Sequence, residues 1–270
     1  MIEALNDSHA WRRGWLPDLG EGLRRRKPGG SSFWMSYMEK KALLERHPDD
    51  AELKLATAEA LLKWMRQVTN GNFPTAETGR VGVGDSPASR KIWKKYAPEA
   101  LALLKSASSY AESGAYDVAK YHFLHAEAST YCSSAKGVIR AAMQGDAISF
   151  MRKVKPLVAD HPTYQGGVGH TFMGAFYLAV PWPVQDLDKA QVHFDAAMKI
   201  DPRSRRNHYC QGLMGLATGD QAKAEASFRQ AVKCKPQTFE EKDVGDFFLK
   251  QSEAALRALS KNQSSPDDSC

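Results

Sequence analysis

The sequence predicts an all-α protein, an α-solenoid of stacked antiparallel helix pairs closed by a C-terminal capping helix. Three observations support this prediction. A set of small and apolar residues recurs after 34 positions in the C-terminal half. Apolar residues elsewhere follow helical spacing. The composition, with 43% hydrophobic and 25% charged residues, is that of an ordinary globular protein. Because a helix pair buries its apolar face only against its neighbours, such a repeat predicts a continuous stack.

The repeat is clearest in the second helices of two successive pairs. A period of 34 residues is that of the tetratricopeptide repeat (TPR), so the predicted solenoid is TPR-like. Alanines let the paired helices approach closely, the phenylalanine fills the gap beside them, and the proline ends the helix because it cannot continue the hydrogen-bond ladder. The recurring residues in the two copies are Ala190, Phe194, Ala197 and Pro202, then Ala224, Phe228, Ala231 and Pro236.

Other residues fit the same packing template. The preceding first helices supply Gly174 and Tyr177 in one pair and Gly212 in the next. A third copy is formed by Tyr110, Ala119, Phe123 and Ala126. With a further, degenerate unit between the third copy and these two pairs, we predict helix pairs at 97–129, 134–161, 166–201 and 205–235.

The N-terminal part of the chain departs from the repeat. Apolar positions at helical spacing predict two helices, at 33–46 and 50–68, with Asp49 or Asp50 as the N-cap of the second. Residues 69–88 contain four glycines and two prolines and predict a long loop. Long loops in compact domains tend to be functional or mobile, so this one is a place to look for what is particular to the protein.

At the C-terminus, residues 241–260 predict one amphipathic helix that caps the exposed end of the stack. The chain is thus expected to have four parts. These are an irregular segment at 1–30, N-terminal helices and a long loop at 31–90, a TPR-like repeat domain at 91–260 and a polar tail at 261–270.

Charge and cysteine content narrow the class of protein. The net charge of +6 permits an acidic partner.

No stretch approaches the roughly 20 apolar residues of a membrane helix, so we expect no transmembrane segment. The cysteines are widely spaced, without a C-x-x-C pair, which argues against a disulfide scaffold or a zinc site and favours a reducing, intracellular compartment. The cytoplasm and the interior of a mitochondrion or another organelle stay open. The cysteines are Cys132, Cys210, Cys234 and Cys270.

No pattern in the sequence predicts catalysis. His122 and His125 share a helix face and could hold a metal, but no third ligand has matched spacing, so a surface or packing role is favoured. The glycine-rich stretch 79–85 follows a predicted helix and lacks the Lys-Ser/Thr ending of a phosphate loop, so a connector is favoured. We expect no enzyme activity, no cofactor and no metal.

Basic and aromatic residues offer sites for partners. A basic cluster near helix ends can recognise acidic groups of another protein, although cations also favour helix C-termini, and both explanations stay open. We expect other proteins as partners, an acidic protein surface among them, and no nucleic acid. The repeat cluster is Lys199, Arg203, Arg205, Arg206, Lys233 and Lys235, and the N-terminal cluster is Arg24, Arg25, Arg26 and Lys27. Aromatic residues that could line a groove for a peptide or helix, although most should be core, are Phe172, Phe176, Tyr177 and Trp182.

The segment 170–243, which begins HTFMGAFYLAV and ends QTFEEKD, resembles the TPR-like domain of the regulator of microtubule dynamics family. The shared features are a longer connection before DLDKA and, after the last repeat, Thr238, Glu240, Glu241 and Asp243. The resemblance covers about 134–260 and extends more distantly to the T component of TRAP-type transporters. It implies a TPR-like fold without catalytic residues.

These observations predict a non-enzymatic protein–protein interaction scaffold, an accessory subunit of a larger complex, with an organelle or the cytoplasm as its location. The first resemblance implies, as an alternative, a microtubule- or organelle-associated regulatory protein. The second implies a small-ligand carrier with a hydrophobic channel through the stack.

Overall fold

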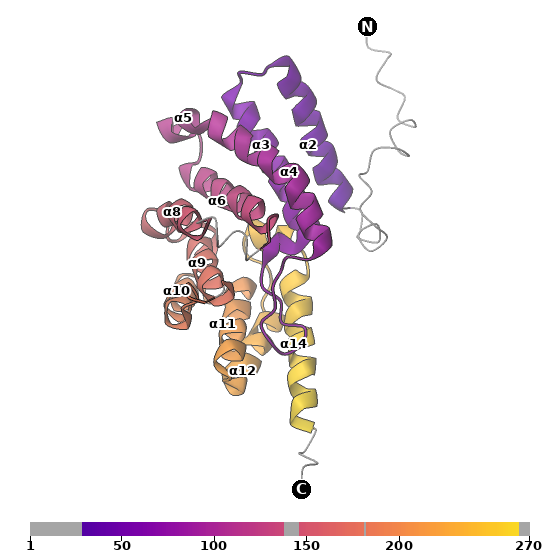
Figure 1. The fold of residues 1–270 in the computed structure, drawn as a ribbon, viewed down its shortest axis with the longest axis vertical. Coiled ribbons are helices and arrows are strands. Elements are labelled where there is room, and N and C mark those ends of the chain that lie inside the picture. The colour runs from indigo at the N-terminus through magenta and orange to yellow at the C-terminus, as the bar shows by residue number, and fades with distance from the viewer. Residues whose placement is uncertain (1–28, 138–145, 181, 265–270) are drawn as a thin grey trace.

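The computed structural model describes residues 29–137, 146–180 and 182–264. Within these ranges the chain is helical and contains no strand, apart from an isolated bridge between Thr75 and Gly82. The helices follow one another along the long axis of the molecule, with α14 running beside the stack (Figure 1). The helices are α2 Gly29–Arg46, α3 Ala51–Thr69, α4 Pro87–Ser106, α5 Ser108–Tyr110, α6 Val118–Ser134, α8 Asp146–Ala159, α9 Val168–Ala179, α10 Leu187–Ile200, α11 Arg205–Thr218, α12 Gln221–Lys233, α13 Phe239–Asp243 and α14 Phe247–Ser264. Shorter 3₁₀ or π segments are η3 Asn70–Asn72, η4 Ala111–Ala115 and η5 Tyr164–Gly166.

Capping residues decide where several of the helices begin. The Asp50 carboxylate accepts a hydrogen bond from the backbone N–H of Leu53, so Asp50, and not Asp49, of the two predicted candidates is the N-cap of α3. The Ser86 hydroxyl caps α4 in the same way, and Pro87 takes the first helical position, where its fixed φ is favourable. Helix α4 therefore begins at residue 87, ten residues before the predicted start of its pair.

The all-helical prediction is confirmed, and successive helices pack as pairs. Phe194 and Phe228 are fully buried, each against a glycine of the preceding helix. A Cβ at Gly174 would lie 2.4 Å from the Phe194 ring, and one at Gly212 would lie 2.5 Å from the Phe228 ring. The recurring alanines are also buried: Ala190, Ala197, Ala224 and Ala231. In the copy nearer the N-terminus, Ala119, Phe123 and Ala126 are buried, whereas Tyr110 and, in α9, Tyr177 are half-buried. Part of the predicted pair at 134–161, residues 138–145, lies outside the described residues.

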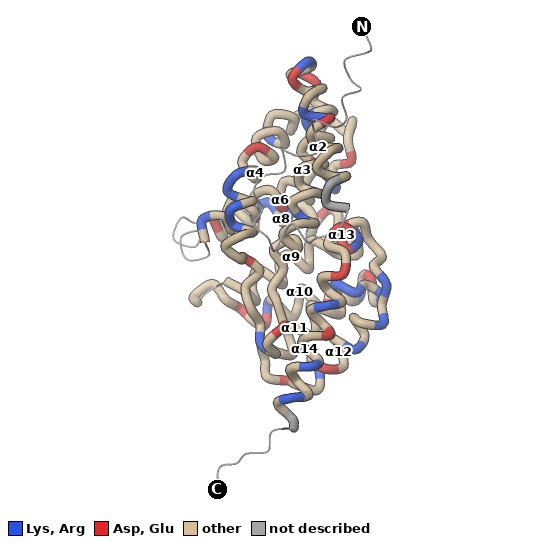
Figure 2. Tube along the Cα trace, turned by 90° about the vertical axis from the view of Figure 1, so that its right-hand side faces the viewer, with Lys and Arg blue, Asp and Glu red and all other residues tan. Residues whose placement is uncertain are grey.

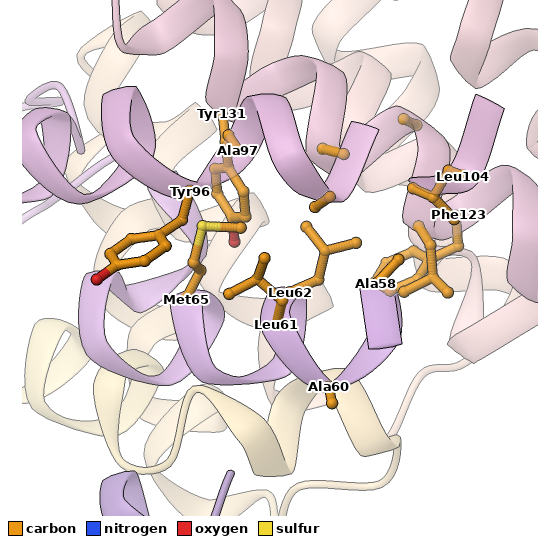
Figure 3. Close-up of a cluster of buried hydrophobic side chains, with 14 of the residues drawn as sticks. Ala58, Ala60, Leu61, Leu62, Met65, Tyr96, Ala97, Leu104, Phe123 and Tyr131 are labelled. Atoms are coloured by element: carbon orange, nitrogen blue, oxygen red, sulfur yellow. The ribbon is translucent and has the colours of Figure 1, made fainter. Parts of the chain in front are cut away.

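The N-terminal half has its own core, made where α3 meets α4 and α6. Leu62 and Met65 of α3 lie among Tyr96 of α4 and Phe123 and Tyr131 of α6, and all five are buried (Figure 3). Apolar burial of this kind is the main stabilising contribution in a helical stack. The second predicted N-terminal helix, α3, is thus integral to the fold.

The C-terminus returns to the start of the stack. In an ideal solenoid each repeat touches only its neighbours, yet α13 contacts α3. The predicted single helix at 241–260 is wrong, because the chain breaks at Gly245, whose φ of 59° is left-handed. Thr238 and Glu241 form a capping box that starts the short helix α13, and α14 follows. Helix α14 also runs into the predicted polar tail, as far as Ser264.

The predicted long loop, at 70–86 in the structure, is packed against the C-terminal half. Phe73 and Ala76 are buried. The Tyr209 hydroxyl donates to the Pro74 carbonyl over 2.6 Å. The Gln251 side chain of α14 accepts from the Ala76 N–H over 2.8 Å. The loop therefore links α3 to α11 and α14. None of the helices in the described part of the chain has the length and apolar character that crossing a membrane requires.

Candidate functional site

An apolar cavity of about 200 Å³ lies between the 70–86 loop and helices α6, α8 and α9. Helix α9 provides one wall with Phe172, Ala175, Phe176 and Ala179, which follow the spacing of a single helix face. Phe150 of α8 stacks on Phe176, with ring centroids 4.9 Å apart. The small Ala175 and Ala179 side chains leave the space that larger residues would fill.

The loop closes the opposite side of this cavity. Phe73, Pro74 and Gly84 line it, and the glycine is required by packing, since a Cβ there would lie 2.2 Å from the Phe73 carbonyl oxygen. The glycine-rich stretch 79–85 that was predicted to be a connector thus owes one of its glycines to close backbone approach. Val83, Gly84 and Asp85 of this stretch line the same cavity as α9, because the chain folds back on itself.

Two large apolar side chains stand exposed at this site. Val83 lines the cavity and is 60% exposed. Trp182 is 85% exposed, and it lies in the connection after α9 between Val180 and Val184, both of which line the cavity. Exposed apolar side chains on two segments that line one apolar cavity make it a candidate interaction site.

The charged groups that border the cavity have partners. The Asp85 carboxylate lies 3.8 Å from the Arg90 guanidinium, and Asp146 pairs with Lys136 at 2.9 Å. The Glu127 carboxylate, also part of the lining, is held by Arg66, as described below. Since each of these three carboxylates is paired with a cation, the cavity itself is suited to an uncharged apolar group.

A buried charge network ties α13 to the rest of the fold. Arg66 of α3 is 2% exposed and binds both carboxylate oxygens of Glu127, at 2.8 and 2.7 Å. Its other terminal nitrogen donates to Asp243 of α13. Tyr131 also donates to Glu127, over 2.8 Å. The Arg66–Glu127 pair tolerates burial because both of its charged groups keep several hydrogen bonds.

A second buried cation, Arg206 of α11, binds the other end of α13. It is fully buried, pairs with Glu240 at 2.7 Å and donates to the carbonyls of Gln165 and Gly166. Burial raises the pKa of Glu240 despite the charge of Arg206. For Glu241, burial is outweighed by the Arg206 charge and the Ser204 hydrogen bond, so its pKa is lowered.

This arrangement corrects the prediction for two residues of the repeat cluster. Arg206 cannot face a partner because it is enclosed by α11, α13 and η5. Arg205 is 8% exposed, and its guanidinium donates to the carbonyls of Ala231 and Cys234, where it satisfies the end of α12. Both arginines are structural in this fold.

The remaining cations of that cluster are on the surface. Lys199 and Lys233 are exposed and lie in the last turns of α10 and α12, where the helix dipole favours a cation. Arg203 and Lys235 are also exposed. The N-terminal cluster Arg24, Arg25, Arg26 and Lys27 lies outside the described residues.

The two histidines considered as metal ligands lie against other side chains. His125 stacks on Tyr121, and burial together with Lys153 and Lys105 lowers its pKa to about 4. Among the residues that the structure describes, no three His, Cys, Asp or Glu side chains are grouped to hold a metal.

Sequence reasoning missed the charge of α4. This helix carries Arg90, Lys91, Lys94, Lys95 and Lys105 but only one carboxylate, Glu99. The signal was present as a run of cations with helical spacing.

Comparison with known proteins found no matching family model and no match among curated proteins. The fold and the site define this chain as an all-helical protein of packed helix pairs. One face of its helix α9 forms a wall of an apolar cavity.

Proposed function

We propose that this chain is a non-enzymatic protein–protein interaction scaffold, an accessory subunit of a larger complex, whose cavity holds an apolar side chain of its partner. The supporting observation is the conjunction of the apolar cavity with exposed Val83 in its lining and exposed Trp182 in the connection whose Val180 and Val184 line it. In protein interfaces a few aromatic or aliphatic anchors in fitted pockets supply most of the binding energy.

The size of the cavity indicates a single side chain. An engineered cavity of roughly 150 Å³ accepts benzene, so about 200 Å³ suits one large side chain such as phenylalanine, leucine or tryptophan. Burying such a group contributes about 1.5–3 kcal/mol. The Trp182 indole would add contact area outside the cavity.

Selection of peptides from a random displayed library on the immobilised full chain tests this function. We expect enrichment of peptides with a large apolar residue, and loss of their binding to Ala175→Trp, which fills the cavity. Val192→Trp is the matched control, since Val192 is 67% exposed on α10 and is not part of the lining.

Melting curves of both variants establish that they are folded. If Ala175→Trp does not fold, Val83→Asp at the rim replaces it. Enriched peptides that bind the cavity-blocked variant as tightly as the parent would contradict the proposed function, as would a library that yields no enrichment.

A second candidate function is a small-ligand carrier, which the apolar lining of the cavity favours. Naphthalene should then raise the Tm of the parent and leave that of Ala175→Trp unchanged, whereas no shift in the parent counts against it. The microtubule- or organelle-associated role stays a prediction from the resemblance at 134–260. Co-sedimentation with microtubules at low salt tests it, and absence of binding there would exclude it.

A further inference from the structure

We infer that the partner's apolar anchor is flanked by acidic residues, and that these carboxylates lie over the N-terminal half of α4. This inference rests on the proposed function and specifies the partner of the same cavity. It follows from the charge, the placement and the surroundings of α4.

Helix α4 carries a local excess of positive charge. It holds five cations and one carboxylate in a chain of net charge +6. That carboxylate, Glu99, is bound by Lys41 of α2 at 2.7 Å and accepts from the Tyr37 hydroxyl at 2.8 Å. It therefore offsets a cation of α2, and, apart from Arg90, which faces Asp85, the cations of α4 are left as a basic surface. Lys and Arg positions gather along α4 in Figure 2.

Helix stability does not explain where these cations lie. Arg90 ends the first turn of α4, where the helix dipole disfavours positive charge, and Lys91, Lys94 and Lys95 lie too far from either end for the dipole to favour them. Arg90 and Lys94, and likewise Lys91 and Lys95, are four residues apart, and like charges at that spacing repel each other. Lys199 and Lys233 differ, because their position at helix C-termini stabilises the helix.

The start of α4 borders the cavity. Asp85, directly before the Ser86 cap, is a lining residue, and the Arg90 guanidinium lies 3.8 Å from its carboxylate. Arg90 also reaches the end of α6, where a Cβ at Gly137 would lie 3.4 Å from it. Lys91 and Lys94 are exposed. A segment anchored in the cavity would thus carry its flanking residues across a basic surface.

Aspartate and glutamate side chains are the groups that this surface complements. Charged residues at the rim of an interface chiefly set association rate, salt dependence and partner choice. The cavity receives the partner's apolar anchor, and α4 favours anchors that are flanked by negative charge. A peptide fits both features together, with one apolar side chain inside and carboxylates outside.

Two synthetic peptides test the inference, each with one central tryptophan, flanked by four aspartates in the first and four asparagines in the second. We expect the aspartate peptide to bind the full chain about tenfold more tightly at low salt, and the advantage to shrink as salt is added. Lys91→Glu/Lys94→Glu should remove the advantage. Lys199→Glu/Lys233→Glu, an equal charge change elsewhere, should keep it.

The outcomes distinguish failure of the acidic flank from failure of the proposed function. Equal affinity of the two peptides, or an advantage that Lys91→Glu/Lys94→Glu keeps, overturns the acidic flank. In that case, loss of both peptides on Ala175→Trp leaves the cavity as the anchor site. Binding of both peptides that Ala175→Trp does not weaken overturns the proposed function as well, and so does the absence of any binding. Saturable binding of anionic phospholipid vesicles, abolished by Ala175→Trp, would replace the acidic peptide by a membrane.

Discussion

Arg66 and Asp243 lie 177 residues apart in the sequence and form a buried ion pair. The same guanidinium holds Glu127 with two hydrogen bonds, so one side chain connects α3, α6 and α13. This contact closes the stack between its first and last thirds. It makes the C-terminal segment a part of the core of the N-terminal half.

The first prediction concerns this cation. Arg66→Met should lower the free energy of unfolding by about 3–5 kcal/mol, because it leaves two buried carboxylates without their cation. Urea titration followed by circular dichroism measures the change. Lys41→Met, which breaks the partly exposed pair with Glu99, should cost no more than about 1 kcal/mol. Equal effects of the two substitutions would mean that Arg66 is not enclosed as described.

The second prediction concerns the packing of the repeat. A glycine in an exposed helix interior is usually improved by alanine, by about 0.5–1 kcal/mol. Gly212→Ala should instead destabilise by about 1–3 kcal/mol, because its Cβ would overlap the Phe228 ring. Adding Phe228→Leu should cost less in the Gly212→Ala background than in the parent. An increase in stability for the single variant would contradict the packing.

The third prediction concerns pH. His170 and His193 lie with their Nδ1 atoms 3.1 Å apart, so one ring must donate and the other must accept. Burial lowers the pKa of both, and for His193 the neighbouring His170 adds to this effect. Unfolding exposes the rings, whose unfolded pKa is near 6.5. Since the unfolded chain then binds more protons, stability should fall as pH drops below about 6.5 towards the folded values.

The free energy of unfolding, measured by urea titration between neutral and mildly acidic pH, tests this behaviour. His193→Gln should flatten the pH dependence relative to the parent. His47→Gln, at an exposed turn, is the control and should keep the parent's slope. A parent whose stability is constant over this range would rule the prediction out.

The fourth prediction concerns thiol reactivity. Burial raises the pKa of Cys210 to about 12, so the folded chain should resist alkylation there. Cys234 is half-buried and should react first of the two. Mass spectrometry after a brief iodoacetamide pulse resolves the sites, with unfolded chain as the reference. Alkylation of both at the same rate in the folded chain would show that α11 is not enclosed.

The sequence was most informative where packing repeats locally. The recurrence of Phe194 as Phe228 predicted two helix pairs, because each ring needs the same small neighbours. The start of α4 was missed since its signals, Ser86 and Pro87, follow a glycine-rich stretch that predicts a loop. The break at Gly245 was missed because the apolar pattern continues past it.

The site could be predicted only in part. Phe172 and Phe176 were candidates for a groove from their place on a first helix. The opposite wall comes from the 70–86 loop, and no local pattern shows that it packs about a hundred residues further on. Burial of Arg205 and Arg206 was likewise hidden, because it depends on partners such as Glu240 that only the tertiary fold brings near.

A crystal structure of the full chain with the aspartate-flanked tryptophan peptide shows directly whether the cavity holds the apolar anchor of a partner. We expect the indole ring inside the cavity, in van der Waals contact with Phe176 and Ala175, and peptide carboxylates beside Lys91 and Lys94. A peptide bound elsewhere on the molecule, with the cavity empty, would contradict it.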